Sequence, residues 1–153
     1  MSAMSQVEQL ILMTKGLKLH PLEEYIGVWF EIVGSEDIRA KFTMRDDLCG
    51  YPGGGVIHGG VISAVMDIIG GHIITWTRLK DVEDQPPPEQ VKKLINIGTI
   101  DLRVDYLRPA KGSEFTATAS ILRIGKKIVV TRMELHNDRQ ILVAVGTGTY
   151  IVG

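Results

Sequence analysis

Apolar and polar residues alternate in the second half of the chain with the two-residue period of half-buried antiparallel strands. The pattern is clear near residue 103, where Leu102 and Val104 flank the charged Arg103. It predicts four consecutive strands, at residues 94–107, 113–124, 126–137 and 140–152, with hairpin turns at Gly125 and at Asp138–Arg139.

The first half of the chain contains helical and strand patterns. Residues 7–19 place apolar side chains near one face of a short helix, which Pro21 ends. Residues 25–33 and 38–44 are rich in aromatic and β-branched residues and predict a hairpin with a turn at 34–37. Glycines and prolines then predict loops at residues 46–55 and 81–89.

Residues 59–77 are apolar on nearly every side of a helix and carry no turn signal near their middle. A helix with this pattern is buried on most of its surface. The segment 61–76 also contains Asp67, His72 and several glycines, so we expect it to be too short and too polar to span a membrane. Five or six antiparallel strands wrapped around this one helix would bury it, which predicts an α+β fold.

The composition is that of an ordinary globular domain. Seventeen basic residues oppose 18 acidic ones, so the net charge of -1 gives no reason to expect a nucleic-acid partner. The single cysteine, Cys49, excludes an internal disulfide and fits a reducing compartment. The N-terminal residues lack the features of a signal peptide, so a cytoplasmic location is expected. No histidine or cysteine cluster has metal-ligand spacing, so no metal is expected.

The candidate chemistry lies at His58-Gly59-Gly60 and at Asp67. A carboxylate in an apolar helix is costly unless it is hydrogen-bonded, paired or open to a cleft. Helical pattern alone leaves two interpretations of Asp67 open: a functional group, or a structural carboxylate bonded to Ser63 or to a neighbouring backbone group. The start of the helix offers unpaired N–H groups that suit a developing oxyanion, and glycines there admit a ligand closely.

Spacing predicts that these two groups act from different subunits. Asp67 lies eight residues beyond Gly59, which is about 12 Å along a helix axis. One helix therefore cannot place both groups on the same carbonyl. If they share a substrate, the site lies at a dimer interface.

Two segments carry a family resemblance. Residues 55–67, with His-Gly-Gly, six further residues and then Asp67, resemble the signature of the phenylacetate-type hotdog thioesterases. Residues 99–110 resemble the family's strand that ends in a Tyr-Leu-Arg-Pro motif. The resemblance extends over residues 24–152. It implies one hotdog domain over residues 1–153, with the short helix at 7–19 preceding the core.

The resemblance implies an acyl-CoA thioesterase, a hydrolase that acts as a homodimer or a dimer of dimers, the latter a homotetramer. Asp67 would serve as general base or nucleophile, and the Gly59 N–H, beside Gly60, would polarise the thioester carbonyl from the other subunit. Thr99 would place the attacking water, and His58 would position the loop. Coenzyme A would enter only as part of the substrate, and no separate cofactor is implied.

Substrate contacts are less sharply indicated. Cations for the CoA phosphates are expected at predicted strand ends, first Arg108 and Lys111, then Lys126 and Lys127. The acyl chain would lie along the apolar helix, where Gly70 and Gly71 leave room. This favours a medium- or long-chain fatty acyl group and leaves an aromatic one open. Many relatives carry an Asn upstream of His-Gly-Gly, whereas residues 48–55 contain none.

Two other functions stay open. A hydroxyacyl thioester dehydratase on the same fold would need His58 and Asp67 together at the substrate, as base and acid. A thioesterase instead needs Thr99 nearest to the carboxylate. A non-catalytic acyl-CoA binding module would bind ligand without turnover, and the missing Asn is its best support.

Overall fold

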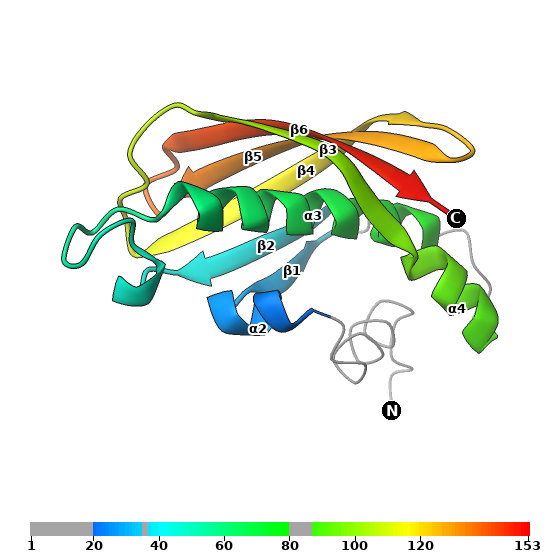
Figure 1. Ribbon diagram of the computed structural model, residues 1–153, viewed down its shortest axis with the longest axis horizontal. Helices are drawn as coiled ribbons and strands as arrows, with labels where there is room; N and C mark the ends of the chain where they lie inside the picture. Colours follow the sequence, from blue (N-terminus) through cyan, green and yellow to red (C-terminus); the bar gives the residue numbers. More distant parts are fainter. Residues whose placement is uncertain (1–19, 35–36, 80–86) are drawn as a thin grey trace.

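The computed structural model describes residues 20–34, 37–79 and 87–153, which form one curved antiparallel sheet and four helical segments (Figure 1). The six strands lie in the order β1-β2-β4-β5-β6-β3. Their bounds are β1 (Trp29–Val33), β2 (Asp37–Thr43), β3 (Ile97–Tyr106), β4 (Glu114–Ile124), β5 (Ile128–Asn137) and β6 (Leu142–Val152). The order of the strands along the chain, the hairpin turns at Gly125 and at Asp138–Arg139 and the α+β class are as predicted, whereas the predicted turn at 34–37 lies partly outside the described residues.

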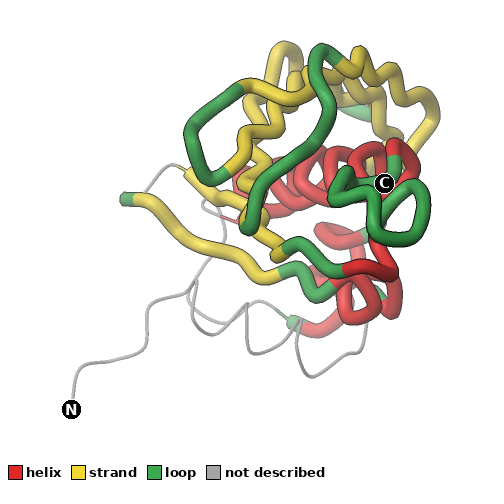
Figure 2. The backbone as a smooth tube through the Cα atoms, turned by 90° about the vertical axis from the view of Figure 1, so that its left-hand side faces the viewer, coloured by secondary structure: helices red, strands yellow, loops and turns green. Residues whose placement is uncertain are grey.

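The long helix α3 (Gly59–Leu79) lies in the curl of the sheet (Figure 2). Its buried residues, among them Val65, Met66 and Ile69, pack against inward-facing side chains of the strands such as Phe42, Phe115 and Leu135. By length and apolarity alone α3 could cross a membrane, contrary to the expectation from residues 61–76. In the fold these apolar side chains form the core.

Two predicted strands begin too early, and prolines explain both errors. Residues 21–26 form the helix α2 (Pro21–Ile26), because proline suits the first turn of a helix and Gly27 ends it in a left-handed conformation. Similarly, Pro88 begins the helix α4 (Pro88–Ile95), so the next strand starts only at Ile97. The predicted helix at 7–19 and most of the predicted loop at 81–89 lie outside the described residues.

The loop between β2 and α3 contains the short 3-10 helix η1 (Asp46–Leu48) and closes by an isolated antiparallel bridge between Cys49 and Ile57. Gly53 and Gly55 both have positive φ, which explains why glycine occupies these positions. The His58 N–H donates to the carbonyl of Leu48. The loop therefore delivers the chain to the start of α3 in a defined direction.

Candidate active site

The carboxylate of Asp67 contacts a hydroxyl group from the sheet. Thr99 Oγ1 lies 2.9 Å and 3.1 Å from the two carboxylate oxygens, so it donates to one of them at a time. Asp67 is half-buried and Thr99 is exposed. The predicted pair of site residues is thus brought together across 32 positions of sequence.

A β-bulge turns Thr99 toward the helix. In a regular strand Thr99 and Leu102 would point to opposite faces, because side chains alternate. The ladder between β3 and β6 instead shifts register between Thr99 and Asp101. The extra residue, Ile100, reverses the alternation. Leu102 packs against the core, and Thr99 faces the same helix.

The side chain of Tyr150 contacts the backbone of Asp67. Its hydroxyl donates to the backbone carbonyl of Asp67 at 3.2 Å. Burial, and to a smaller extent the negative charge of Asp67, raises the pKa of the Tyr150 phenol. A Cβ on Gly70 would collide with the same hydroxyl. The space at Gly70 therefore holds Tyr150 and not an acyl chain, which corrects the expectation for this glycine. A Cβ on Gly71 would meet no atom of the described chain within 4 Å.

Among the described residues, one N–H group at the start of α3 has no acceptor. The His58 carbonyl accepts from Val61 and Ile62, and its side-chain Nδ1 accepts from the Gly60 N–H at 2.8 Å. His58 is therefore the N-cap residue of the helix. No acceptor for the Gly59 N–H is found among the described residues.

Ser63 does not hold Asp67. Its hydroxyl donates to the carbonyl of Gly59 at 3.0 Å or of Gly60 at 3.2 Å, one turn earlier in the helix. The predicted bond between Ser63 and Asp67 is therefore wrong, and the functional interpretation of Asp67 stays a prediction.

Tyr106 is a residue of this region that our reading of the sequence missed. Its hydroxyl donates to the carbonyl of Gly59 at 3.0 Å, and a Cβ on Gly59 would lie 3.3 Å from the Tyr106 ring. Tyr106, the last residue of β3, therefore holds the peptide group between Gly59 and Gly60 in place. Its place in the Tyr-Leu-Arg-Pro segment was the available signal.

The four basic residues predicted to bind the CoA phosphates lie in two pairs, one at each end of β4. Arg108 and Lys111 lie in the loop before β4, and Lys126 and Lys127 lie in the turn after it (Figure 1). The ten residue steps of this strand span about 33 Å. The Ile57 N–H donates to the carbonyl of Ala110, so the first pair lies beside the start of α3.

Within one chain, Gly59 and Asp67 lie about two helical turns apart on α3, a separation of about 12 Å.

The strand β3, which carries Thr99, is the last strand of the sheet, and in the described chain it pairs with β6 alone. Its exposed side chains include Ile100 and Tyr106. An exposed edge of ten residues is a ready surface for pairing with another chain.

The chain is similar to thioesterases in sequence. Residues 54–144 match the Thioesterase superfamily. The chain is 37% identical to the medium/long-chain acyl-CoA thioesterase YigI of Escherichia coli, with 100% of both chains covered. The protein of the same name from Salmonella typhimurium is 36% identical, again with 100% of both covered.

A solved structure has the same fold. The crystal structure of a Shewanella oneidensis protein, described as related to the thioesterase superfamily, superposes with a TM-score of 0.84 at 35% sequence identity. The match covers 99% of this chain and 100% of that one. The predicted hotdog fold is confirmed.

Proposed function

Because the chain belongs to the thioesterase superfamily, we propose that it hydrolyses medium- or long-chain acyl-CoA thioesters to a fatty acid and free CoA. The chain-length class comes from the name of its relatives in Escherichia coli and Salmonella typhimurium. The observation that carries the proposal is the contact of Thr99 with Asp67, which holds a half-buried carboxylate on a mostly apolar helix.

In the proposed reaction Asp67 takes a proton from water as the water oxygen attacks the thioester carbonyl carbon. The carbon–sulfur bond then breaks, and the CoA sulfur leaves and takes up a proton. The Thr99 hydroxyl donates to Asp67 and keeps lone pairs that can accept from the water. In the alternative, the Asp67 carboxylate attacks the carbonyl carbon and the carbon–sulfur bond breaks, so CoA leaves as a thiolate that takes up a proton; water then cleaves the resulting anhydride to the fatty acid and free Asp67.

The carbonyl oxygen would be held by the Gly59 N–H of a second subunit. This N–H lies at a helix N-terminus, where partial positive charge favours a developing oxyanion. The separation of Gly59 from Asp67 supports a shared site, as does the free edge of β3. The proposed unit is a homodimer formed through β3, alone or in pairs as a tetramer, in the cytoplasm.

For the CoA phosphates we propose Arg108 and Lys111 in preference to Lys126 and Lys127. The first two flank the start of α3, where the thioester carbonyl would bind. For the acyl chain we propose the open side of α3 next to Gly71.

The test is the release of free thiol from a panel of acyl-CoAs of two to 18 carbons, about the range of common fatty acyl groups, with phenylacetyl-CoA included. Asp67→Asn should lose about 10²- to 10⁴-fold in kcat, the usual contribution of a general base. Asp37→Asn is the matched control, because this exposed carboxylate lies on β2, near the opposite end of the strand order from the proposed dimer edge β3. A folded Asp67→Asn variant with wild-type turnover would sink the proposal.

A binding module is the competing function, and it predicts that wild type and Asp67→Asn bind acyl-CoA equally without releasing thiol. A dehydratase would instead add or remove water across a carbon–carbon bond. The Nδ1 of His58 accepts from the Gly60 N–H, so in the neutral ring the other nitrogen carries the hydrogen and cannot act as the base that a dehydratase needs. This observation favours hydrolysis.

A further inference from the structure

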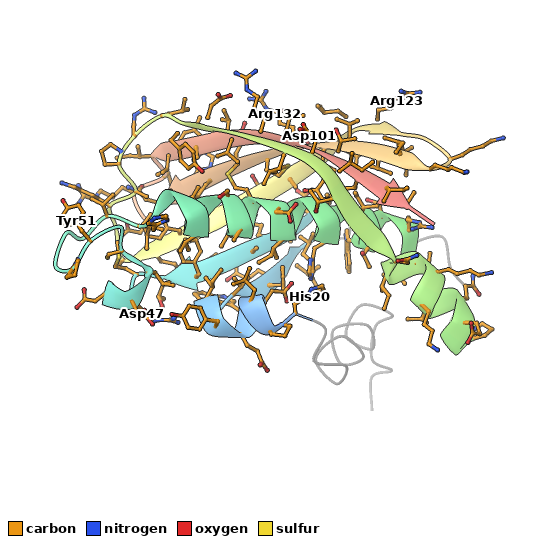
Figure 3. The ribbon with its side chains drawn as sticks, viewed as in Figure 1. His20, Asp47, Tyr51, Asp101, Arg123 and Arg132 are labelled. Carbon is orange, nitrogen blue, oxygen red and sulfur yellow. The ribbon has the colours of Figure 1, made fainter. Side chains whose placement is uncertain are left out.

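Three side chains that bind metals in other proteins lie together between α2 and α3. Glu23 belongs to α2, His20 immediately precedes it, and His72 comes from α3. Their candidate ligand atoms all lie within 4.8 Å of one another. Figure 3 shows His20 beside the start of α2, below the C-terminal half of α3. Sequence spacing gave no sign of this group, because His72 is distant from the other two in the chain.

The ring of His72 is held in one orientation. Its Nδ1 lies 3.0 Å from the carbonyl oxygen of Ile68, and because a carbonyl only accepts, Nδ1 carries the ring hydrogen. Phe30 stacks on the ring with a centroid distance of 4.3 Å. In the neutral ring this arrangement leaves the lone pair on Nε2.

That lone pair faces a carboxylate oxygen that has no donor. His72 Nε2 lies 3.3 Å from Glu23 Oε1, and the two side chains are 20% and 15% exposed. Glu23 Oε1 is buried and has no hydrogen-bond partner in the part of the chain that the structure describes. Two electron-rich atoms this close need a proton or a metal ion between them, because a buried polar atom without a partner costs free energy.

We propose that His20, Glu23 and His72 bind a divalent cation, with Zn²⁺ the best match. Two imidazoles and one carboxylate, with water in a fourth position, are a common zinc ligand set. Tetrahedral bonds of about 2.1 Å place ligand atoms about 3.4 Å apart. The distances here are 3.3 Å for His72 Nε2 and 3.8 Å for His20 Nδ1, each to Glu23 Oε1.

The cation would join α2 to the core helix. The His20 side chain is 50% exposed, so its ring can turn to complete the site. A shared proton between Glu23 and His72 would also satisfy their two facing atoms, but it would not need His20. The convergence of the third ligand is what favours a metal ion over a proton.

The test uses the full chain, purified without a polyhistidine tag and stripped of metal with a chelator. Zn²⁺ is added, and the bound ion is counted by mass spectrometry after gel filtration; affinity comes from competition with a chromophoric chelator. One ion per chain is expected, together with a higher Tm in Zn²⁺, since the ion binds the folded state. Co²⁺ should give the visible absorption of a tetrahedral site.

Glu23→Gln and His20→Ala should each weaken Zn²⁺ binding by about tenfold or more and abolish the rise in Tm. Glu24→Gln is the matched control, because Glu24 is the exposed neighbour of Glu23 on the same helix. The proposal is overturned if wild type binds no stoichiometric Zn²⁺, or if Glu23→Gln and Glu24→Gln bind it equally. A shared proton then explains the Glu23–His72 pair. None of these readings depends on thioesterase activity.

Discussion

Gly59→Pro removes the proposed oxyanion donor while it preserves the helix start. Gly59 is the first helical residue after the N-cap His58, a position where proline is favoured and needs no N–H partner. The residue before a proline prefers extended backbone, which also suits an N-cap. We therefore expect the free energy of unfolding to change by no more than about 1 kcal/mol.

The expected effect on catalysis is much larger. Loss of one oxyanion donor costs about 2.7–4 kcal/mol of transition-state stabilisation, or about 10²- to 10³-fold in kcat. Gly59→Ala is the matched control: it keeps the N–H and meets the same Tyr106 ring at 3.3 Å. The assay is steady-state thiol release, corrected for the thiol of Cys49. If Gly59→Pro and Gly59→Ala have kcat values within about threefold, the N–H is not the donor.

Mixed dimers test whether the site is shared. A chain with Gly59→Pro still supplies Asp67, and a chain with Asp67→Asn still supplies the Gly59 N–H. Random pairing of the two inactive chains at equal amounts would restore about a quarter of the wild-type sites if each site uses both subunits. Co-expression followed by the thiol assay measures this fraction. No recovery in verified mixed dimers would refute the two-subunit arrangement.

Three further predictions concern neighbouring residues. Gly70→Ala should lower the free energy of unfolding by about 1–3 kcal/mol, because the added carbon meets the buried Tyr150. Gly71→Ala has open space, so it should be neutral or up to about 1 kcal/mol stabilising. Equal free energies of unfolding for the two variants in denaturant titrations would contradict this. Tyr106→Phe should lower kcat/KM by about fivefold, roughly 1 kcal/mol for one hydrogen bond, with Tm nearly unchanged; an unaltered kcat/KM would argue against its positioning role. Arg108→Ala should raise the KM for acyl-CoA by about tenfold, in line with the loss of one charged contact, whereas Lys126→Ala should leave the KM unchanged. A larger rise in KM for Lys126→Ala than for Arg108→Ala would place the phosphate site at the other end of β4.

The strand order along the sequence, the central helix and the α+β class could all be predicted, because each depends on periodicity within a short segment. The errors were local as well. Prolines at positions 21 and 88 were treated as breaks or loop residues, although each begins a short helix in the structure. The candidate site came from two motifs. The helix pattern alone marked Asp67 as an unusual carboxylate, whereas the role of His58 as the helix cap was not predicted.

Other features of the site depend on contacts between segments that are distant in the sequence. Simple alternation would turn Thr99 away from α3; the bulge at Ile100, set by register with β6, turns it toward Asp67. The room at Gly70 is occupied by Tyr150, which no helical pattern can show. His20 and His72 converge on Glu23 because α2 packs against α3. Periodicity reports which face of an element is buried, whereas the partner across that face is fixed by register and packing in three dimensions.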